Sequence, residues 1–217
     1  MSDAPAGAHG HHVAHHFADA EAEFEAAKQG MWLFLVTEVL MFGGLFVAYT
    51  MFRGLYPEMF REAHKALNVT MGATNTVVLI TSSLTMVLGV GAAQRGEKSR
   101  TTKYLILTFL LACVFLVIKY FEYSHKFHDG LLPGAFFHNE EFKNPKTPLF
   151  FSLYFIMTGL HGFHVVVGMA LMAWLLRRNL RGDFEGGYYT PVELVGFYWH
   201  FVDLVWIYLF PLMYLIS

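Results

Sequence analysis

Long apolar stretches alternate with short polar connections along almost the whole chain after residue 30. Five of these stretches are long enough to cross a hydrocarbon layer of about 30 Å, which takes about 20 helical residues. They cover residues 30–52, 70–93, 102–124, 148–176 and 192–216. The pattern predicts an all-α integral membrane protein in which residues 30–217 form one bundle of five transmembrane helices.

The first 29 residues have a different, polar pattern. Five histidines lie between His9 and His16, and an Ala/Glu-rich stretch follows from Ala18. A histidine-rich tract can collect divalent metal, although a solvated tail is the simpler interpretation and the one we favour. The strong helix formers after Ala18 predict a surface helix that leads into the first span.

Composition supports a lipid environment. Of the 217 residues, 55% are hydrophobic, 17% are aromatic and only 15% are charged, which is too apolar for an ordinary soluble domain. No basic cluster with interleaved aromatics indicates nucleic-acid binding. The single cysteine, Cys113, lies inside the third predicted span and excludes any site that needs two thiolates.

The polar connections differ in their content of lysine and arginine. One side of the predicted bundle has six, diluted among acids, in the connections 53–69 and 125–147. The other side has eight, mostly in short connections: Lys28, Arg95, Lys98, Arg100, Lys103, Arg177, Arg178 and Arg181. The positive-inside tendency predicts a cytoplasmic N-terminus and an external C-terminus.

Five ionisable residues interrupt the spans at similar depths. Glu38 lies in the first span, His161 and His164 in the fourth, and His200 and Asp203 in the fifth. A rise of 1.5 Å per residue places all five between the inner half of the membrane and its midplane. Such groups are costly in lipid unless they face inward and are paired. We therefore predict that these five residues form a buried polar layer.

This polar layer allows three interpretations: mutual pairing that stabilises the bundle, a proton or ion path, and a metal or haem site. A carboxylate-bridged di-iron site normally takes two Glu-x-x-His repeats, and the chain has one, Glu122 to His125. A haem held by His161 or His164 together with His200 stays open. From the residues alone, we favour structural pairing, with no metal site.

Several segments resemble subunit III of the haem–copper terminal oxidases, the cytochrome c oxidase type. YWHFVDLVWI, residues 198–207, is similar to the last helix of that family, and TGLHGFHVVVG, residues 158–168, is similar to its Thr-Gly-x-His-Gly-x-His signature. WLFLVTEVLMFGGLFVAY, residues 32–49, resembles the family's helix with a single acidic residue. NTVVLITSSLTM, residues 75–86, and FEYSH, residues 121–125, follow in the family's order.

The chain departs from the family pattern in three places. The first two spans of the long, seven-span form are missing, so the chain resembles the five-helix bacterial form. Lys119 stands where the family usually has glutamine, three residues before Glu122, which predicts an in-helix Lys119–Glu122 pair. The connection 125–147 is longer than the family leads us to expect and could contact an additional partner.

The resemblance implies an accessory role in a proton-pumping oxygen reductase of the bacterial cytoplasmic membrane. Such a subunit catalyses nothing and holds no haem or copper, which reside in partner subunits. It packs against subunit I in a complex with subunit II and small subunits, binds phospholipid, and sustains proton uptake; the complex could join a respiratory supercomplex. Glu38 corresponds to the family's buried acid on the uptake side. The alternatives are a subunit of a quinol oxidase or nitric oxide reductase, and a self-sufficient membrane metalloenzyme.

Overall fold

The computed structural model describes residues 19–133, 136–139, 142, 144–184 and 188–215. The histidine-rich tract 9–16 lies outside these residues. Within the described residues five helices are long and apolar enough to span a membrane, which confirms the predicted fold class. The elements are α1 (Ala20–Leu55), α2 (Pro57–Ala63), a 3-10 turn η1 (His64–Ala66), α3 (Val69–Gln94), α4 (Lys98–His128), α5 (Thr147–Arg181) and α6 (Thr190–Tyr214).

The helices extend past the apolar stretches that predict them. The sequence predicts a surface helix that leads into the first span, and α1 runs through both parts as a single helix of 36 residues. It starts at an Asp19 cap, whose side chain accepts a hydrogen bond from the Ala22 N–H at 2.8 Å. The alanines and glutamates that follow favour helix, so nothing interrupts the chain before the apolar part.

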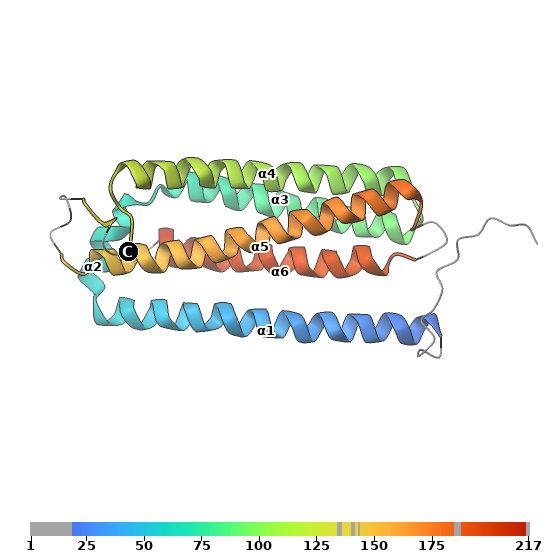
Figure 1. The fold of residues 1–217 in the computed structure, drawn as a ribbon, viewed down its shortest axis with the longest axis horizontal. Coiled ribbons are helices and arrows are strands. Elements are labelled where there is room, and N and C mark those ends of the chain that lie inside the picture. The colour runs from blue at the N-terminus through green and yellow to red at the C-terminus, as the bar shows by residue number, and fades with distance from the viewer. Residues whose placement is uncertain (1–18, 134–135, 140–141, 143, 185–187, 216–217) are drawn as a thin grey trace, which may run out of the picture.

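Four of the spanning helices, α3 to α6, pack together, while α1 lies along one side of them (Figure 1). In the most apolar window of α1 only 11% of the residues are buried, against 56% for α6. Near its end, the Tyr49 hydroxyl donates to the Leu212 carbonyl at 2.6 Å and ties α1 to α6. Most of the α1 surface is therefore left for lipid or for partner subunits.

Two buried tryptophans fix α6 against α3. The indole N–H of Trp199 donates to the Ser82 hydroxyl at 3.1 Å, and that of Trp206 donates to the Thr76 hydroxyl at 3.1 Å. Buried indoles usually need such a partner. The two bonds lie seven residues apart on α6, so they hold one face of the helix along about 10 Å of its length.

The connections at the two ends of the bundle are held by different kinds of contact. Between α3 and α4, Arg95 and Arg100 donate to opposite oxygens of Glu97 at 3.1 and 2.9 Å. Hydrogen bonding from Arg95 first, and from Arg100, lowers the pKa of the Glu97 carboxyl. At the other end, the described part of the long connection packs the ring of Phe137 against Phe151 of α5. This contact turns the connection back onto the bundle.

Candidate functional site: buried polar groups between the helices

Glu38 on α1 and His164 on α5 form a hydrogen-bonded pair, with 3.0 Å between Glu38 Oε2 and His164 Nε2. The other ring nitrogen, Nδ1, lies 2.8 Å from the Leu160 carbonyl oxygen. Because a carbonyl only accepts, Nδ1 must carry a hydrogen. Nε2 then either donates to a Glu38 carboxylate or accepts from a protonated Glu38. In both states one proton lies between the two side chains and the pair has no net charge.

Aromatic side chains enclose this pair. The Phe42 ring stands edge-on to His164 at 5.2 Å between centroids, and the Tyr198 hydroxyl donates to the His164 carbonyl at 3.1 Å. The side chains of Glu38 and His164 keep 15% and 9% of their surface exposed. The pair is thus a largely buried polar link between α1 and α5.

His200 and Asp203 lie one turn apart on α6 but are not hydrogen-bonded to each other. The Nδ1 atom of His200 lies 2.8 Å from the Ser83 hydroxyl on α3. Within the described residues neither carboxyl oxygen of Asp203 has a hydrogen-bond partner, and the residue is only 2% exposed.

His161 is fully buried on α5, and neither of its ring nitrogens has a partner among the described residues. Its ring packs against Phe115 and Trp206, at centroid distances of 5.5 and 5.3 Å, and these two rings also contact each other at 5.0 Å. A buried imidazole of this kind packs as an aromatic ring while keeping two unused polar atoms.

The structure joins two of the five residues of the predicted polar layer, Glu38 and His164, and gives each of the others separate surroundings. Residues three apart share a helix face but stand one above the other along the axis, so each meets a different neighbour. Sequence depth alone cannot distinguish these cases. Within the part of the chain that the structure describes, no three His, Cys, Asp or Glu side chains gather in a group that could hold a metal ion.

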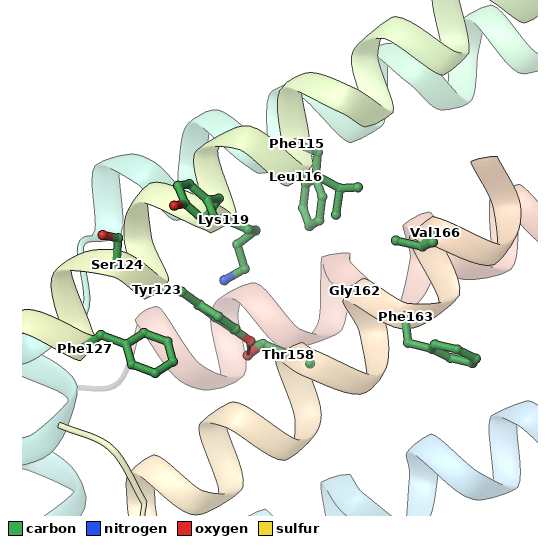
Figure 2. A pocket seen from close by; sticks show the side chains of 12 residues that line it. Phe115, Leu116, Lys119, Tyr123, Ser124, Phe127, Thr158, Gly162, Phe163 and Val166 are labelled. Carbon is green, nitrogen blue, oxygen red and sulfur yellow. Dashed lines mark hydrogen bonds between the residues drawn. The ribbon is translucent and has the colours of Figure 1, made fainter. Parts of the chain in front are cut away.

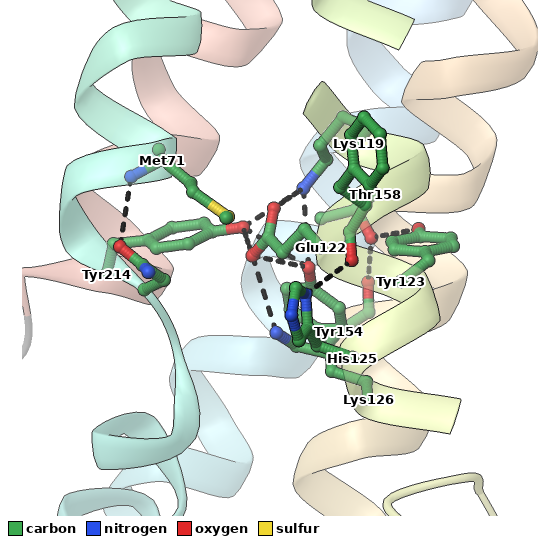
Figure 3. Close-up of polar contacts among 12 residues, drawn as sticks. Met71, Lys119, Glu122, Tyr123, His125, Lys126, Tyr154, Thr158 and Tyr214 are labelled. Atoms are coloured by element: carbon green, nitrogen blue, oxygen red, sulfur yellow. Dashed lines mark hydrogen bonds and ion pairs between the residues drawn. The ribbon is translucent and has the colours of Figure 1, made fainter. Parts of the chain in front are cut away.

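A second polar cluster surrounds Glu122, near the C-terminal end of α4 (Figure 3). Lys119 Nζ lies 2.9 Å from Glu122 Oε2, and Lys126 Nζ lies 3.4 Å from Oε1. Tyr154 of α5 and Tyr214 of α6 donate to the same Oε1 at 3.0 and 2.5 Å. Sequence analysis singled out Lys119 and Glu122 but missed the other three. Lys126 could have been found from its i+4 spacing to Glu122, whereas the tyrosines carry no local signal.

The buried charged groups of the Glu122 cluster have several hydrogen-bond partners. The Lys119 ammonium also donates to the Tyr214 and Tyr154 hydroxyls at 3.0 and 3.3 Å. It lies 4.8 Å from the centre of the Trp206 ring, within the range of a cation–π interaction. Lys119, Glu122 and Lys126 are each at most 7% exposed. The cluster therefore links α4, α5 and α6 through charge-assisted hydrogen bonds.

Lys119 also borders an apolar groove of about 700 Å³ between α4 and α5 (Figure 2). Gly159 and Gly162 of α5 leave the space that the groove occupies, since a Cβ added at Gly162 would meet nothing within 4 Å. Phe115 and Phe127 of α4 lie twelve residues apart in its lining, which corresponds to about 18 Å along the helix. Its size and apolar lining suit one or two lipid acyl chains.

Comparison with known proteins identifies the family. The family model described as cytochrome c oxidase subunit III matches residues 8–217. This chain belongs to the cytochrome c oxidase subunit III family. The match covers the Glu38–His164 pair and the Glu122 cluster, and it confirms the resemblance on which the sequence interpretation rests.

Relatives of this subunit III chain share about a third of its residues. It is 33% identical over 213 residues to the protein named cytochrome c oxidase subunit 3 of Synechocystis sp., covering 98% of this chain and 81% of the relative. It is 34% identical over 190 residues to that of Corynebacterium diphtheriae, covering 87% of each. The chain is therefore a multi-pass membrane subunit of a haem–copper oxidase, an oxidoreductase complex.

The geometry predicts which carboxyl a hydrophobic carbodiimide modifies. The reagent needs a protonated carboxyl that it can reach from the membrane. Glu38 can accept the shared proton and keeps 15% of its side chain exposed, whereas Glu122 and Asp203 are each 2% exposed. Peptide mapping by mass spectrometry should find the adduct on Glu38, and Glu38→Gln should abolish it. Labelling of Glu122 or Asp203 before Glu38 is labelled would contradict this assignment.

Proposed function

We propose that this chain is the accessory subunit of a proton-pumping oxygen reductase: it stabilises catalytic subunit I, binds phospholipid and sustains proton uptake. The complex would lie in the bacterial cytoplasmic membrane, with the N-terminus of the chain in the cytoplasm. Haem and copper would be bound by the partner subunits. The observation that carries the proposal is the Glu38–His164 pair, which places a proton-binding carboxyl between α1 and α5.

Three further features support an accessory role. The single proton between Glu38 and His164 can lie on either side chain, since His164 Nδ1 bonds a backbone carbonyl and Nε2 faces the carboxyl. The groove between α4 and α5 has the size and lining for acyl chains. The exposed, apolar surface of α1 is available to a partner subunit. The relatives are named cytochrome c oxidase subunit 3, which favours this complex over a quinol oxidase or nitric oxide reductase.

Oxygen uptake against time tests the proposal. A complex that lacks this chain should start at a normal rate and then lose activity over many turnovers, faster at high pH where protons are scarce. Glu38→Gln, with the chain in place, should stay within about twofold of wild type, which corresponds to about 0.4 kcal/mol in a barrier. The difference between the two preparations would assign the effect to assembly and packing.

The controls separate support from catalysis. Haem content and the subunit list of each preparation show whether the complex has assembled. Abolished activity in an assembled Glu38→Gln complex would place Glu38 on an obligatory proton path and contradict a supporting role. Constant activity without the chain would contradict the whole proposal.

A further inference from the structure

A second groove, of about 250 Å³, is open between α3 and α6. It begins between Gln94 and Glu193, at the bundle end where α3 stops and α6 starts, and extends along both helices to Val87 and His200. From Glu193 to His200 is about 10 Å of helix, so the groove reaches into the level of the spans. It is smaller than a typical small-ligand pocket of about 300–1,000 Å³ and therefore suits side chains of another protein.

His200 brings a hydrogen-bonding group to the deep end of this groove. Its Nδ1 atom lies 2.8 Å from the Ser83 hydroxyl, and its Nε2 atom has no hydrogen-bond partner within the described residues. The residue is partly exposed at the bundle surface. A polar group without a partner is costly in hydrocarbon. A groove covered only by acyl chains would leave that cost in place, because acyl chains form no hydrogen bonds.

The bond to Ser83 determines which kind of partner Nε2 needs. In the part of the chain that the structure describes, the Ser83 hydroxyl bonds no side chain or carbonyl other than His200. It therefore donates to Nδ1, since the opposite direction would leave its own hydrogen unused inside the bundle. A neutral imidazole carries one hydrogen, which then lies on Nε2. The groove thus presents an N–H donor, and its occupant must present an oxygen acceptor.

The α4–α5 groove differs in this respect. The Tyr123 hydroxyl lies 2.5 Å from the Thr158 hydroxyl, and the Lys119 ammonium donates to Glu122 and to two tyrosines. These groups are satisfied by the chain itself, so acyl chains can cover them at no such cost. The same acyl chains over the α3–α6 groove would leave the His200 N–H unpaired.

Two glycines shape the α3–α6 groove for a neighbouring helix. A Cβ added at Gly196 would lie 3.0 Å from Val90 Cγ2, so this glycine lets α6 approach α3 closely and form the floor. A Cβ added at Gly91 would meet only the end of the Arg95 side chain, at 3.4 Å, so the space above Gly91 is open. Small residues are enriched where membrane helices pack, because they let two backbones approach closely.

We propose that the α3–α6 groove is the docking site for a transmembrane helix of a partner oxidase subunit, which places an oxygen acceptor against His200 Nε2. The acceptor is a hydroxyl, carbonyl or carboxylate oxygen, complementary to the N–H donor. An apolar side chain of the same helix fills the space above Gly91. The inference rests on the proposed accessory role only in taking the partner from the same complex.

Two substitutions at His200 separate docking from packing inside the chain. The amide of asparagine lies where Nδ1 lies and keeps the bond from Ser83, whereas the amide of glutamine reaches the position of Nε2 and offers an N–H donor there. His200→Asn should raise the fraction of this chain released from the complex in mild detergent about threefold. That corresponds to about 0.6 kcal/mol, the average for a hydrogen bond between membrane helices. His200→Gln should stay near wild type. The reverse order would show that His200 serves only Ser83, and it would overturn the proposal.

Filling the groove is an independent test. Gly91→Leu should raise the released fraction by at least about tenfold, or about 1.4 kcal/mol. Gly162→Leu places the same side chain into open space beside the α4–α5 groove and should be retained like wild type. Circular dichroism of the released chain shows that Gly91→Leu has folded. Normal retention of Gly91→Leu would contradict docking in this groove.

A photoreactive residue at Leu84 identifies the occupant directly. Leu84 is 59% exposed on α3, one turn from Val87, so benzoylphenylalanine at this position lies beside the groove without filling it. We expect a cross-link to another subunit of the complex, identified by peptide mass spectrometry. Cross-links to lipid alone, or to a second copy of this chain, would overturn the proposal. Oxygen uptake is not measured, so failure of the proposed role in turnover would leave these results unaffected.

Discussion

Replacing Glu122 by glutamine is expected to cause the largest loss of stability of any single change in the bundle. The substitution keeps the size of the side chain but removes the negative charge that Lys119 and Lys126 share at 2.9 and 3.4 Å. Both ammonium groups are buried, and breaking a buried ion pair in this way typically costs about 3–5 kcal/mol. The loss of stability is measured as the fall in the thermal midpoint at which the chain is released from the purified complex.

Two controls test whether the loss of stability arises because the charges are buried, and not simply because a charge is removed. Glu97→Gln breaks contacts to Arg95 and Arg100 of similar length at the surface and should leave the midpoint unchanged, because solvent screens such pairs. The triple change Lys119→Met, Glu122→Leu and Lys126→Met removes all three charges together and should recover most of the loss. If Glu122→Gln behaves like Glu97→Gln, the lysines do not depend on Glu122 for their burial.

Gly168→Leu is expected to separate α5 from α6. A Cβ at this position would lie 2.7 Å from two ring carbons of Trp199 and 3.3 Å from Tyr198. The Trp199 ring is fully buried and is fixed by its hydrogen bond to Ser82, so it cannot give way. Overpacking of a dense core costs about 1–3 kcal/mol, and a whole leucine should reach at least the upper end of that range. Lower yield and a lower thermal midpoint of the complex would record it.

The matched control for this substitution lies six residues earlier on α5. A Cβ at Gly162 would meet nothing within 4 Å, so Gly162→Leu introduces the same side chain into open space beside the α4–α5 groove. It should assemble normally. Equal damage from both substitutions would show that leucine harms α5 wherever it is placed, and that the contact with Trp199 is not the cause.

The number and type of the transmembrane helices could be predicted from the sequence because the bilayer imposes a length and a polarity on each span. The Lys119–Glu122 contact could be predicted because a helix fixes the distance between residues three apart. The pairing of Glu38 with His164 could not, since their 126-residue separation carries no geometric information. Depth places them near each other, but rotation of α1 and α5 about their own axes decides whether they touch.

The partners of Glu122 on other helices could not be predicted from the sequence either. Its tyrosines come from α5 and α6, 32 and 92 residues from Glu122 along the chain. Tyrosine near a membrane boundary is common enough as an interfacial anchor that nothing in its local sequence marks it as a buried donor. Which hydroxyl satisfies which carboxylate follows from the packing of three helices at once.

The contacts of α1 determine the order in which parts of the bundle can assemble during synthesis. The Tyr49 hydroxyl of α1 donates to the Leu212 carbonyl, 163 residues later in the chain. The partner of Glu38, His164, belongs to α5, which is also synthesised later. At a synthesis rate of about 5–20 residues per second, α1 waits on the order of ten seconds in the membrane before either contact can form. During that interval Glu38 has no histidine beside it, so insertion itself favours the protonated acid. The insertion machinery, or a subunit already in place, would have to shelter this helix until the last span emerges from the ribosome.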